Sequence, residues 1–209
     1  MASSITLILG GARSGKSDYA QQLAVASGRA VVFVATATPS ATEDDPEMAE
    51  RIAAHRRARP AQWQTVEETI ELVNAIVQHT QPDDVVVIDC LTLWVSNVCL
   101  AELDEEAEAD GASLEHWRLL EAALTTQTAA LLHVARSKQI DVILISNEVG
   151  LGVVPAFPLG RHYRDLLGRV NQAVAREADS VILMVAGLPI NLRRLALTHS
   201  PLDRDKDVL

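Results

Sequence analysis

The sequence contains few aromatic residues and almost no cysteine. Aromatic residues make up 3% of its 209 residues, hydrophobic residues make up 48%, and the two cysteines are Cys90 and Cys99. Two cysteines are too few for a disulfide framework and lack metal-ligand spacing, so we interpret both as buried thiols. Because aromatic residues are scarce, the core has to be built from Ala, Val, Leu and Ile, as in sheets covered by helices. The composition therefore favours an α/β fold.

The sequence also lacks an excess of basic charge and any long apolar run. It has 28 acidic residues against 18 basic ones, a formal net charge of −10, which argues against a nucleic-acid partner because phosphate-backbone binding needs a basic face. A small anionic ligand needs only a local basic cluster. No apolar run approaches the ~18 residues of a membrane span, and no basic segment precedes residues 5–9. We therefore expect a cytoplasmic protein without a membrane span.

Short apolar runs alternate with segments of helical periodicity. The predicted strands cover residues 5–9, 30–35, 85–89, 141–145 and 181–185. The predicted helices cover about residues 17–27, 45–59, 69–79, 91–100, 113–135 and 161–177. This alternation predicts a mostly parallel sheet with helices on both faces. We expect one domain over residues 1–199, with an acidic excursion at about 102–112 and a disordered tail at 200–209.

A glycine-rich motif lies between the first predicted strand and the first predicted helix. It matches the pattern G-x-x-x-x-G-K-[ST] of a phosphate-binding loop, or P-loop, and consists of Gly10, Gly11, Ala12, Arg13, Ser14, Gly15, Lys16 and Ser17. The glycines let backbone N–H groups wrap a phosphate, and the following helix directs its positive dipole end at the anion. Lys16 would reach the β- and γ-phosphates, and the Ser17 hydroxyl would coordinate Mg²⁺. The motif predicts a nucleoside triphosphate site on a P-loop NTPase-like (RecA-like) fold.

Other polar residues are candidates for the same site, each with a structural alternative. Asp89 ends a buried strand and suits a second magnesium ligand, directly or through water, although acids at strand ends also serve as caps. Asn147 and Glu148 follow the strand 141–145, at the sheet edge where ligands of such folds bind, yet Asn147 could equally cap a helix. A basic cluster that suits a triphosphate, or simply a solvated helix end, contains Arg51, His55, Arg56, Arg57 and Arg59. By its spacing alone, His55 fits a partly buried structural residue.

Several sequence blocks occur in a fixed order with the P-loop. They cover residues 35–37, 47–60, 63–67, 147–155, 160–165 and 168–172. In their order and spacing they resemble the bifunctional adenosylcobinamide kinase/adenosylcobinamide-phosphate guanylyltransferase family of cobalamin biosynthesis. The resemblance spans nearly the whole chain, although only the P-loop is specific on its own.

The resemblance implies two reactions on a corrinoid side chain. The first phosphorylates the aminopropanol hydroxyl of adenosylcobinamide with ATP or GTP, and the second transfers GMP from GTP to that phosphate. The family's nucleophilic histidine, which becomes guanylylated, falls on His55. Family nucleotide contacts carry over to Ala35, Thr36, Ala37, Arg56, Arg57, Ala58, Arg59, Glu67 and Asp89. The resemblance also implies a homotrimer with sites between subunits.

This chain departs from some relatives at two of these positions. Ala54-His55 stands where some relatives have two histidines, which leaves one candidate nucleophile. Asp89 stands where relatives can have Glu, and its shorter side chain suits a water-mediated magnesium contact.

Two other functional classes remain open from the residues alone. A small-metabolite kinase without nucleotidyl transfer would use the same P-loop and give His55 no covalent role. A nucleotide-dependent switch or assembly ATPase would not need catalysis on a small substrate. The sequence lacks the Asn-Lys-x-Asp segment of guanine-specific switches, but adenine-binding ATPases do not need it.

Overall fold

The computed structural model describes residues 3–37, 50, 53, 56–57, 59–102 and 113–196. The helix predicted at 45–59 falls mostly outside these residues, and both His55 and Ala58 lie outside them. The same holds for nearly all of the acidic excursion and for the predicted tail.

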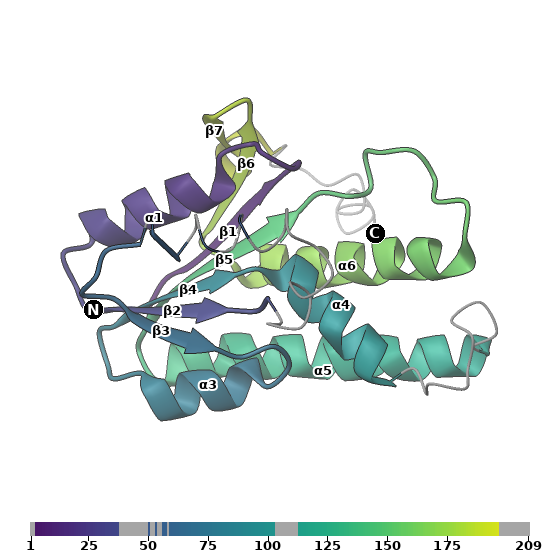
Figure 1. Cartoon of the computed structure of the whole chain (residues 1–209), viewed down its shortest axis with the longest axis horizontal. Helices are drawn as coiled ribbons and strands as arrows, with labels where there is room; N and C mark the ends of the chain where they lie inside the picture. Colours follow the sequence, from purple (N-terminus) through teal and green to yellow (C-terminus); the bar gives the residue numbers. More distant parts are fainter. Residues whose placement is uncertain are drawn as a thin grey trace, which may run out of the picture.

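A seven-stranded sheet forms the centre of the molecule (Figure 1). In spatial order its strands are β3 (Gln64–Glu67), β2 (Val31–Ala35), β4 (Val85–Asp89), β5 (Asp141–Asn147), β1 (Ile5–Gly10), β6 (Ser180–Val185) and β7 (Leu188–Asn191). Neighbouring strands pair in parallel except for β6 and β7, which are antiparallel. Since β5 lies between the P-loop strand β1 and the strand β4 that ends in Asp89, the predicted RecA-like arrangement is confirmed.

Helices cover both faces of this sheet, as the sequence predicts (Figure 1). On one face lies α1 (Lys16–Ala26). The other face is covered by α3 (Leu72–His79), α4 (Leu91–Glu102), α5 (Leu114–Ser137) and α6 (Pro158–Glu177). A short helix, α7 (Leu192–Leu195), follows β7.

Alternating strand residues supply the two cores. Ile8 and Val87 pack with α1, whereas their neighbours Leu7 and Ile88 pack with the helices of the opposite face. Successive side chains of a strand point to opposite faces, so an apolar run with no polar alternation is buried on both sides. The Ala-, Val-, Leu- and Ile-rich core expected from the composition follows from this arrangement.

Two edge strands were not predicted from the sequence. β3 has a polar, mostly exposed sequence, and among the described strands it pairs with β2 alone. β7 turns back from β6 through Ala186 and Gly187, whose φ angles of 51° and 81° suit the two-residue loop of a hairpin. An Ala-Gly loop is a weaker hairpin signal than Asn-Gly, so the pattern did not reveal this strand. The helix α6 begins at Pro158, three residues before the predicted start at about Arg161. Proline is a favoured first residue of a helix because its missing N–H would have no partner there.

Candidate nucleotide and phosphoryl-transfer site

The P-loop connects the carboxyl end of β1 to the start of α1. A Cβ added at Gly10 would stand 2.6 Å from the Met184 carbonyl oxygen, and Gly15 has a φ of +91°, so both positions require glycine. The Gly187 N–H donates to the Ser14 carbonyl at 3.0 Å, which ties the loop to the β6–β7 hairpin. The sequence therefore folds into a loop that ends on a helix N-terminus, the arrangement that binds phosphate.

The Lys16 side chain is buried within this loop. It is 8% exposed, and its ammonium group donates to the Gly11 carbonyl at 2.6 Å and to Ser14 Oγ at 3.5 Å. Burying a charged ammonium group costs free energy unless the group has hydrogen-bond partners. The Gly11 carbonyl is one of these partners. The group is held where an anion on the loop would meet it.

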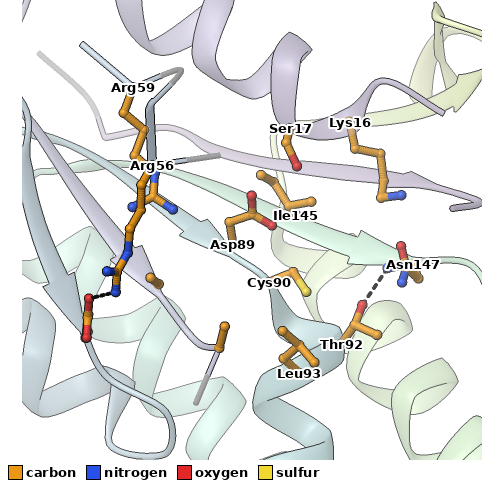
Figure 2. Close-up of a pocket in the computed structure, with 13 residues that line it drawn as sticks. Lys16, Ser17, Arg56, Arg59, Asp89, Cys90, Thr92, Leu93, Ile145 and Asn147 are labelled. Atoms are coloured by element: carbon orange, nitrogen blue, oxygen red, sulfur yellow. Dashed lines mark hydrogen bonds and ion pairs between the residues drawn. The ribbon is translucent and has the colours of Figure 1, made fainter. Parts of the chain in front are cut away.

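A cavity opens beside Lys16 at the carboxyl edge of the sheet (Figure 2). It has a volume of about 230 Å³. Its lining residues are Lys16, Ser17, Ala35, Ala37, Arg56, Arg59, Glu67, Asp89, Cys90, Thr92, Leu93, Ile145 and Asn147. The structure thus brings together predicted residues from the P-loop, β2, β3, β4 and the segment before Pro60.

Asp89 faces the P-loop from the end of β4. In Figure 2 its carboxylate and the Ser17 hydroxyl point toward each other across the cavity. Behind Asp89, the fully buried Thr36 accepts the Cys90 N–H at 2.7 Å and donates its hydroxyl to the Cys90 carbonyl at 2.8 Å. The Thr36 N–H also donates to the Asp89 carbonyl at 3.1 Å. Thr36 is therefore a support behind the cavity wall, and its side chain does not line the cavity.

The oxygen donors of Ser17 and Asp89 suit Mg²⁺. Hydroxyl and carboxylate oxygens are the hard ligands that Mg²⁺ prefers, and this ion usually takes its other ligands from phosphates and water. Within the described ranges, no group of three or more His, Cys, Asp or Glu side chains could hold a metal by itself. Ser17 and Asp89 are the residues of this cavity that could hold Mg²⁺ together with a nucleotide.

Arginines line the opposite side of the cavity. The Arg59 guanidinium lies 3.7 Å from the centre of the Phe33 ring, a cation–π contact. Burial lowers the pKa of Arg59, and the Asp89 carboxylate opposes this shift. Arg56 forms a half-exposed ion pair with Glu67 at the mouth of the cavity. These cations face the P-loop across the space that a triphosphate would occupy.

Arg57 points elsewhere. It is exposed and pairs with Glu50 at 2.6 Å, and it does not line the cavity. His55 and Ala58 are outside the described residues, so their predicted contacts stay predictions.

Sequence reasoning did not single out part of the cavity wall. Cys90, Thr92 and Leu93 come from the turn and first residues of α4, and Ile145 comes from β5. Burial and, as a smaller cause, the negative charge of Asp89 raise the pKa of the Cys90 thiol to about 11. Thr92 Oγ1 accepts the Asn147 N–H at 2.8 Å and so joins α4 to the end of β5 (Figure 2). The sequence signal for Cys90, Thr92 and Leu93 was their position shortly after Asp89, and the signal for Ile145 was its place at the end of a predicted strand.

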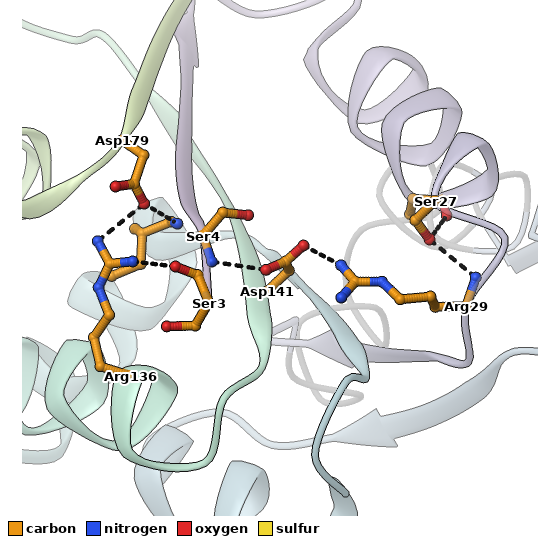
Figure 3. A network of polar contacts seen from close by, with 9 residues as sticks. Ser3, Ser4, Ser27, Arg29, Arg136, Asp141 and Asp179 are labelled. Carbon is orange, nitrogen blue, oxygen red and sulfur yellow. Dashed lines mark hydrogen bonds and ion pairs between the residues drawn. The ribbon is translucent and has the colours of Figure 1, made fainter. Parts of the chain in front are cut away.

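The amino edge of the sheet is closed by a polar network (Figure 3). Asp141 accepts the Ser4 N–H at 2.7 Å and pairs with Arg29. Asp179 accepts the Ile5 N–H at 2.7 Å and pairs with Arg136 at 2.9 Å. Both carboxylates bond to backbone N–H groups at the start of β1 and to arginines, and so hold β1 beside β5 and β6. This edge of the sheet is therefore structural, whereas the candidate site lies at the carboxyl edge.

Comparisons with known proteins match nearly the whole chain. The family model described as cobinamide kinase / cobinamide phosphate guanyltransferase matches residues 6–192. The chain is 41% identical over 187 residues to the bifunctional adenosylcobalamin biosynthesis protein CobP of Pseudomonas aeruginosa, covering 90% of this chain and 96% of the relative. It is 37% identical over 187 residues to CobU of Escherichia coli K12 and 38% identical over 190 residues to CobU of Salmonella typhimurium, both named as bifunctional adenosylcobalamin biosynthesis proteins. Each of these alignments covers 90% of this chain and 98% of the relative.

Among solved structures, the RadB recombinase is similar over 87% of this chain and 74% of its own, with 18% identity and a TM-score of 0.47. None of the helices in the described part of the chain is long and apolar enough to cross a membrane.

Proposed function

Because the chain belongs to the cobinamide kinase / cobinamide phosphate guanyltransferase family, we propose that it performs both reactions of that name at the cavity beside the P-loop. It is a transferase of adenosylcobalamin biosynthesis. The observation that carries the proposal is that Lys16, Ser17 and Asp89 line one cavity in a chain that the family model matches over residues 6–192.

The first reaction is phosphoryl transfer from ATP or GTP to adenosylcobinamide. The aminopropanol hydroxyl oxygen attacks the γ-phosphorus, the hydroxyl proton is released, and the nucleoside diphosphate leaves. Lys16 and the N–H groups of the P-loop hold the β- and γ-phosphates and stabilise the charge that develops on them. Ser17 and Asp89, together with the nucleotide, would hold Mg²⁺, which would supply neutralisation of phosphate charge.

The second reaction is transfer of GMP from GTP. A neutral imidazole nitrogen of His55 attacks the α-phosphorus and pyrophosphate leaves, which gives a guanylylated histidine. A phosphate oxygen of adenosylcobinamide phosphate then attacks the same phosphorus and releases the imidazole. Arg56 and Arg59 line the cavity and follow His55 within four positions of the sequence, which suits them to neutralise charge on the α-phosphate.

We also propose the assembly and setting that the family resemblance implies. The chain forms a homotrimer with sites between subunits, works in the cytoplasm, and takes its metal as Mg²⁺ with the nucleotide. Analytical ultracentrifugation tests the assembly, and a monomer at micromolar concentration would contradict it.

A turnover assay with matched variants tests the two reactions separately. The purified protein is incubated with adenosylcobinamide, GTP and Mg²⁺, and the corrinoid products are separated by chromatography. We expect adenosylcobinamide phosphate and adenosyl-GDP-cobinamide from the intact protein, only the phosphate from His55→Ala, and neither from Lys16→Ala. A small-metabolite kinase without nucleotidyl transfer would give no adenosyl-GDP-cobinamide in any sample, and a switch or assembly ATPase would give neither product.

A further inference from the structure

A second cavity lies on the α6 side of the P-loop strand. It is an open groove of about 580 Å³, within the size range of small-molecule sites. We call it the α6 groove, and its lining residues are Leu9, Glu148, Gly150, Arg164, Asp165, Gly168, Arg169, Asn171, Gln172 and Ala175. The nucleotide cavity shares none of these residues, so the groove is a separate site.

The groove has the charge balance of a site for a neutral ligand. It is lined by two arginines and two acids, and both arginines are paired within the protein. Arg164 pairs with Asp165 at 3.1 Å, and Arg169 pairs with Glu121 at 3.1 Å. Glu148 accepts the Gly150 N–H at 2.7 Å. With its cations neutralised, the groove has little affinity for a further phosphate, but its acids and amides offer hydrogen-bond acceptors and donors.

Asn171 lines the groove and has an unpaired acceptor. Its side chain is 6% exposed, and its Nδ2 donates to the Asn147 carbonyl at 3.1 Å, which fixes the orientation of the amide. Among the described residues, its Oδ1 is buried and has no hydrogen-bond partner. A buried acceptor without a partner costs free energy, and this oxygen lies behind the surface of the groove, out of reach of a ligand.

The groove and the nucleotide cavity meet at the end of β5. Asn147 lines the nucleotide cavity, and the next residue, Glu148, lines the groove. The Glu148 N–H donates to the carbonyl of Gly10, the first residue of the P-loop, at 3.1 Å. Leu9, directly before the P-loop, also lines the groove. A ligand in the groove is therefore next to the loop that holds the phosphates.

We propose that the α6 groove binds the amide-bearing edge of adenosylcobinamide and presents its aminopropanol arm to the nucleotide. The periphery of this acceptor carries uncharged amides, which both donate and accept hydrogen bonds and so match the paired charges and the Gln172 amide of the groove. The inference rests on the proposed function, because it names the place where the acceptor of both reactions binds.

Gly168 provides the means to block the groove without disturbing its walls. A Cβ added at this helical glycine meets no described atom within 4 Å. Leucine is also a better helix former than glycine, so Gly168→Leu is expected to fold and to fill the groove with its side chain. Gly168→Ala adds one methyl group at the same place, and Ala129→Leu, at an exposed position of α5 outside both cavities, is the matched control for an added leucine side chain.

The experiment measures each variant with and without the acceptor. For Gly168→Leu we expect the KM for adenosylcobinamide to rise at least about tenfold, and its Kd by equilibrium dialysis to rise in parallel, because the leucine occupies the ligand's space. Gly168→Ala gives a smaller rise and Ala129→Leu gives none. Covalent labelling by GTP in the absence of corrinoid stays within about twofold of the intact protein for all three, since it uses only the nucleotide cavity.

Two outcomes overturn the inference. One is a folded Gly168→Leu variant, shown by an unchanged melting temperature, whose KM and Kd for adenosylcobinamide match those of Ala129→Leu. The other is a parallel loss of GTP labelling, which would assign the groove to the nucleotide. Failure of the proposed function itself looks different, because the intact protein would then not phosphorylate adenosylcobinamide at all.

Discussion

Replacing Thr36 by valine is predicted to destabilise the fold and to slow both reactions. Valine has nearly the shape of threonine but no hydroxyl group, so the Cys90 N–H loses the partner that it has at 2.7 Å. The Cys90 C=O loses the hydroxyl at 2.8 Å but keeps the Trp94 N–H at 3.1 Å. Cys90 follows Asp89 directly, and the Thr36 N–H donates to the Asp89 carbonyl. The loss therefore falls on the segment that positions the Asp89 carboxylate.

The magnitude follows from one orphaned N–H and from the second hydrogen bond that the Cys90 C=O loses. The N–H left without a partner costs about 1–3 kcal/mol, and the lost second bond costs about 0.5–1.5 kcal/mol. The added methyl group returns about 1 kcal/mol. The expected loss in the free energy of unfolding is therefore about 0.5–3.5 kcal/mol, which a domain with a typical stability of about 5–15 kcal/mol survives.

Urea unfolding followed by tryptophan fluorescence measures this loss, and kcat of the kinase reaction measures the effect on Asp89. Thr36→Ser is the matched control, because it keeps the hydroxyl and removes only a methyl group, at a cost of about 1 kcal/mol. The reasoning would be refuted if the valine variant were as stable as the intact protein and more stable than the serine variant. That result would mean that methyl burial, and not the pair of hydrogen bonds, holds this segment.

Three further changes probe other parts of the account. Asp141→Ala should lower the free energy of unfolding by about 2–3 kcal/mol, since it leaves the Ser4 N–H and a partly buried arginine without their partner, while the Kd for GTP stays within about twofold. Cys90, with a pKa near 11, should react with iodoacetamide at pH 8 at least about 100-fold more slowly than a free cysteine, as followed by mass spectrometry. Asp89→Asn should speed that reaction, because it removes a carboxylate that raises the thiol pKa and so increases the thiolate fraction at a given pH. Arg59→Lys should slow GMP transfer about tenfold, measured in single turnover, because lysine loses the planar contact with Phe33.

The sequence predicted the features of this protein that depend on residues close together in the chain. The P-loop is one of them, because its glycines, Lys16 and Ser17 act within eight consecutive positions, 10–17. The apolar runs 85–88 and 142–145 are another, since a strand buried on both faces has polar residues only at its ends. Both patterns can be recognised in the sequence without knowing which distant residues the segment contacts.

The parts that the sequence did not predict depend on contacts between distant residues. The support that Thr36 gives to the cavity wall is one of them, because its hydroxyl bonds to Cys90, 54 positions away, whereas the nucleotide contact implied by resemblance stays a prediction. The α6 groove forms because the fold brings Leu9 of β1 to the same cavity as Asn171 of α6. These residues are far apart in the sequence, so no local pattern predicts the groove. β3 has no apolar run because, as an edge strand, it is mostly exposed and relies on backbone pairing with β2.

Covalent labelling with GTP tests the central claim, that the nucleotide reacts at its α-phosphorus as well as at its γ-phosphorus. The pure protein is incubated with α-labelled GTP and Mg²⁺ without corrinoid, denatured, and tested for bound label that is labile in acid and stable in base, as a histidine phosphoramidate is. We expect such label on the intact protein and on the control His133→Ala, whose histidine is exposed on α5, and none on His55→Ala. Undiminished label on His55→Ala, or no label on the intact protein, would contradict the account.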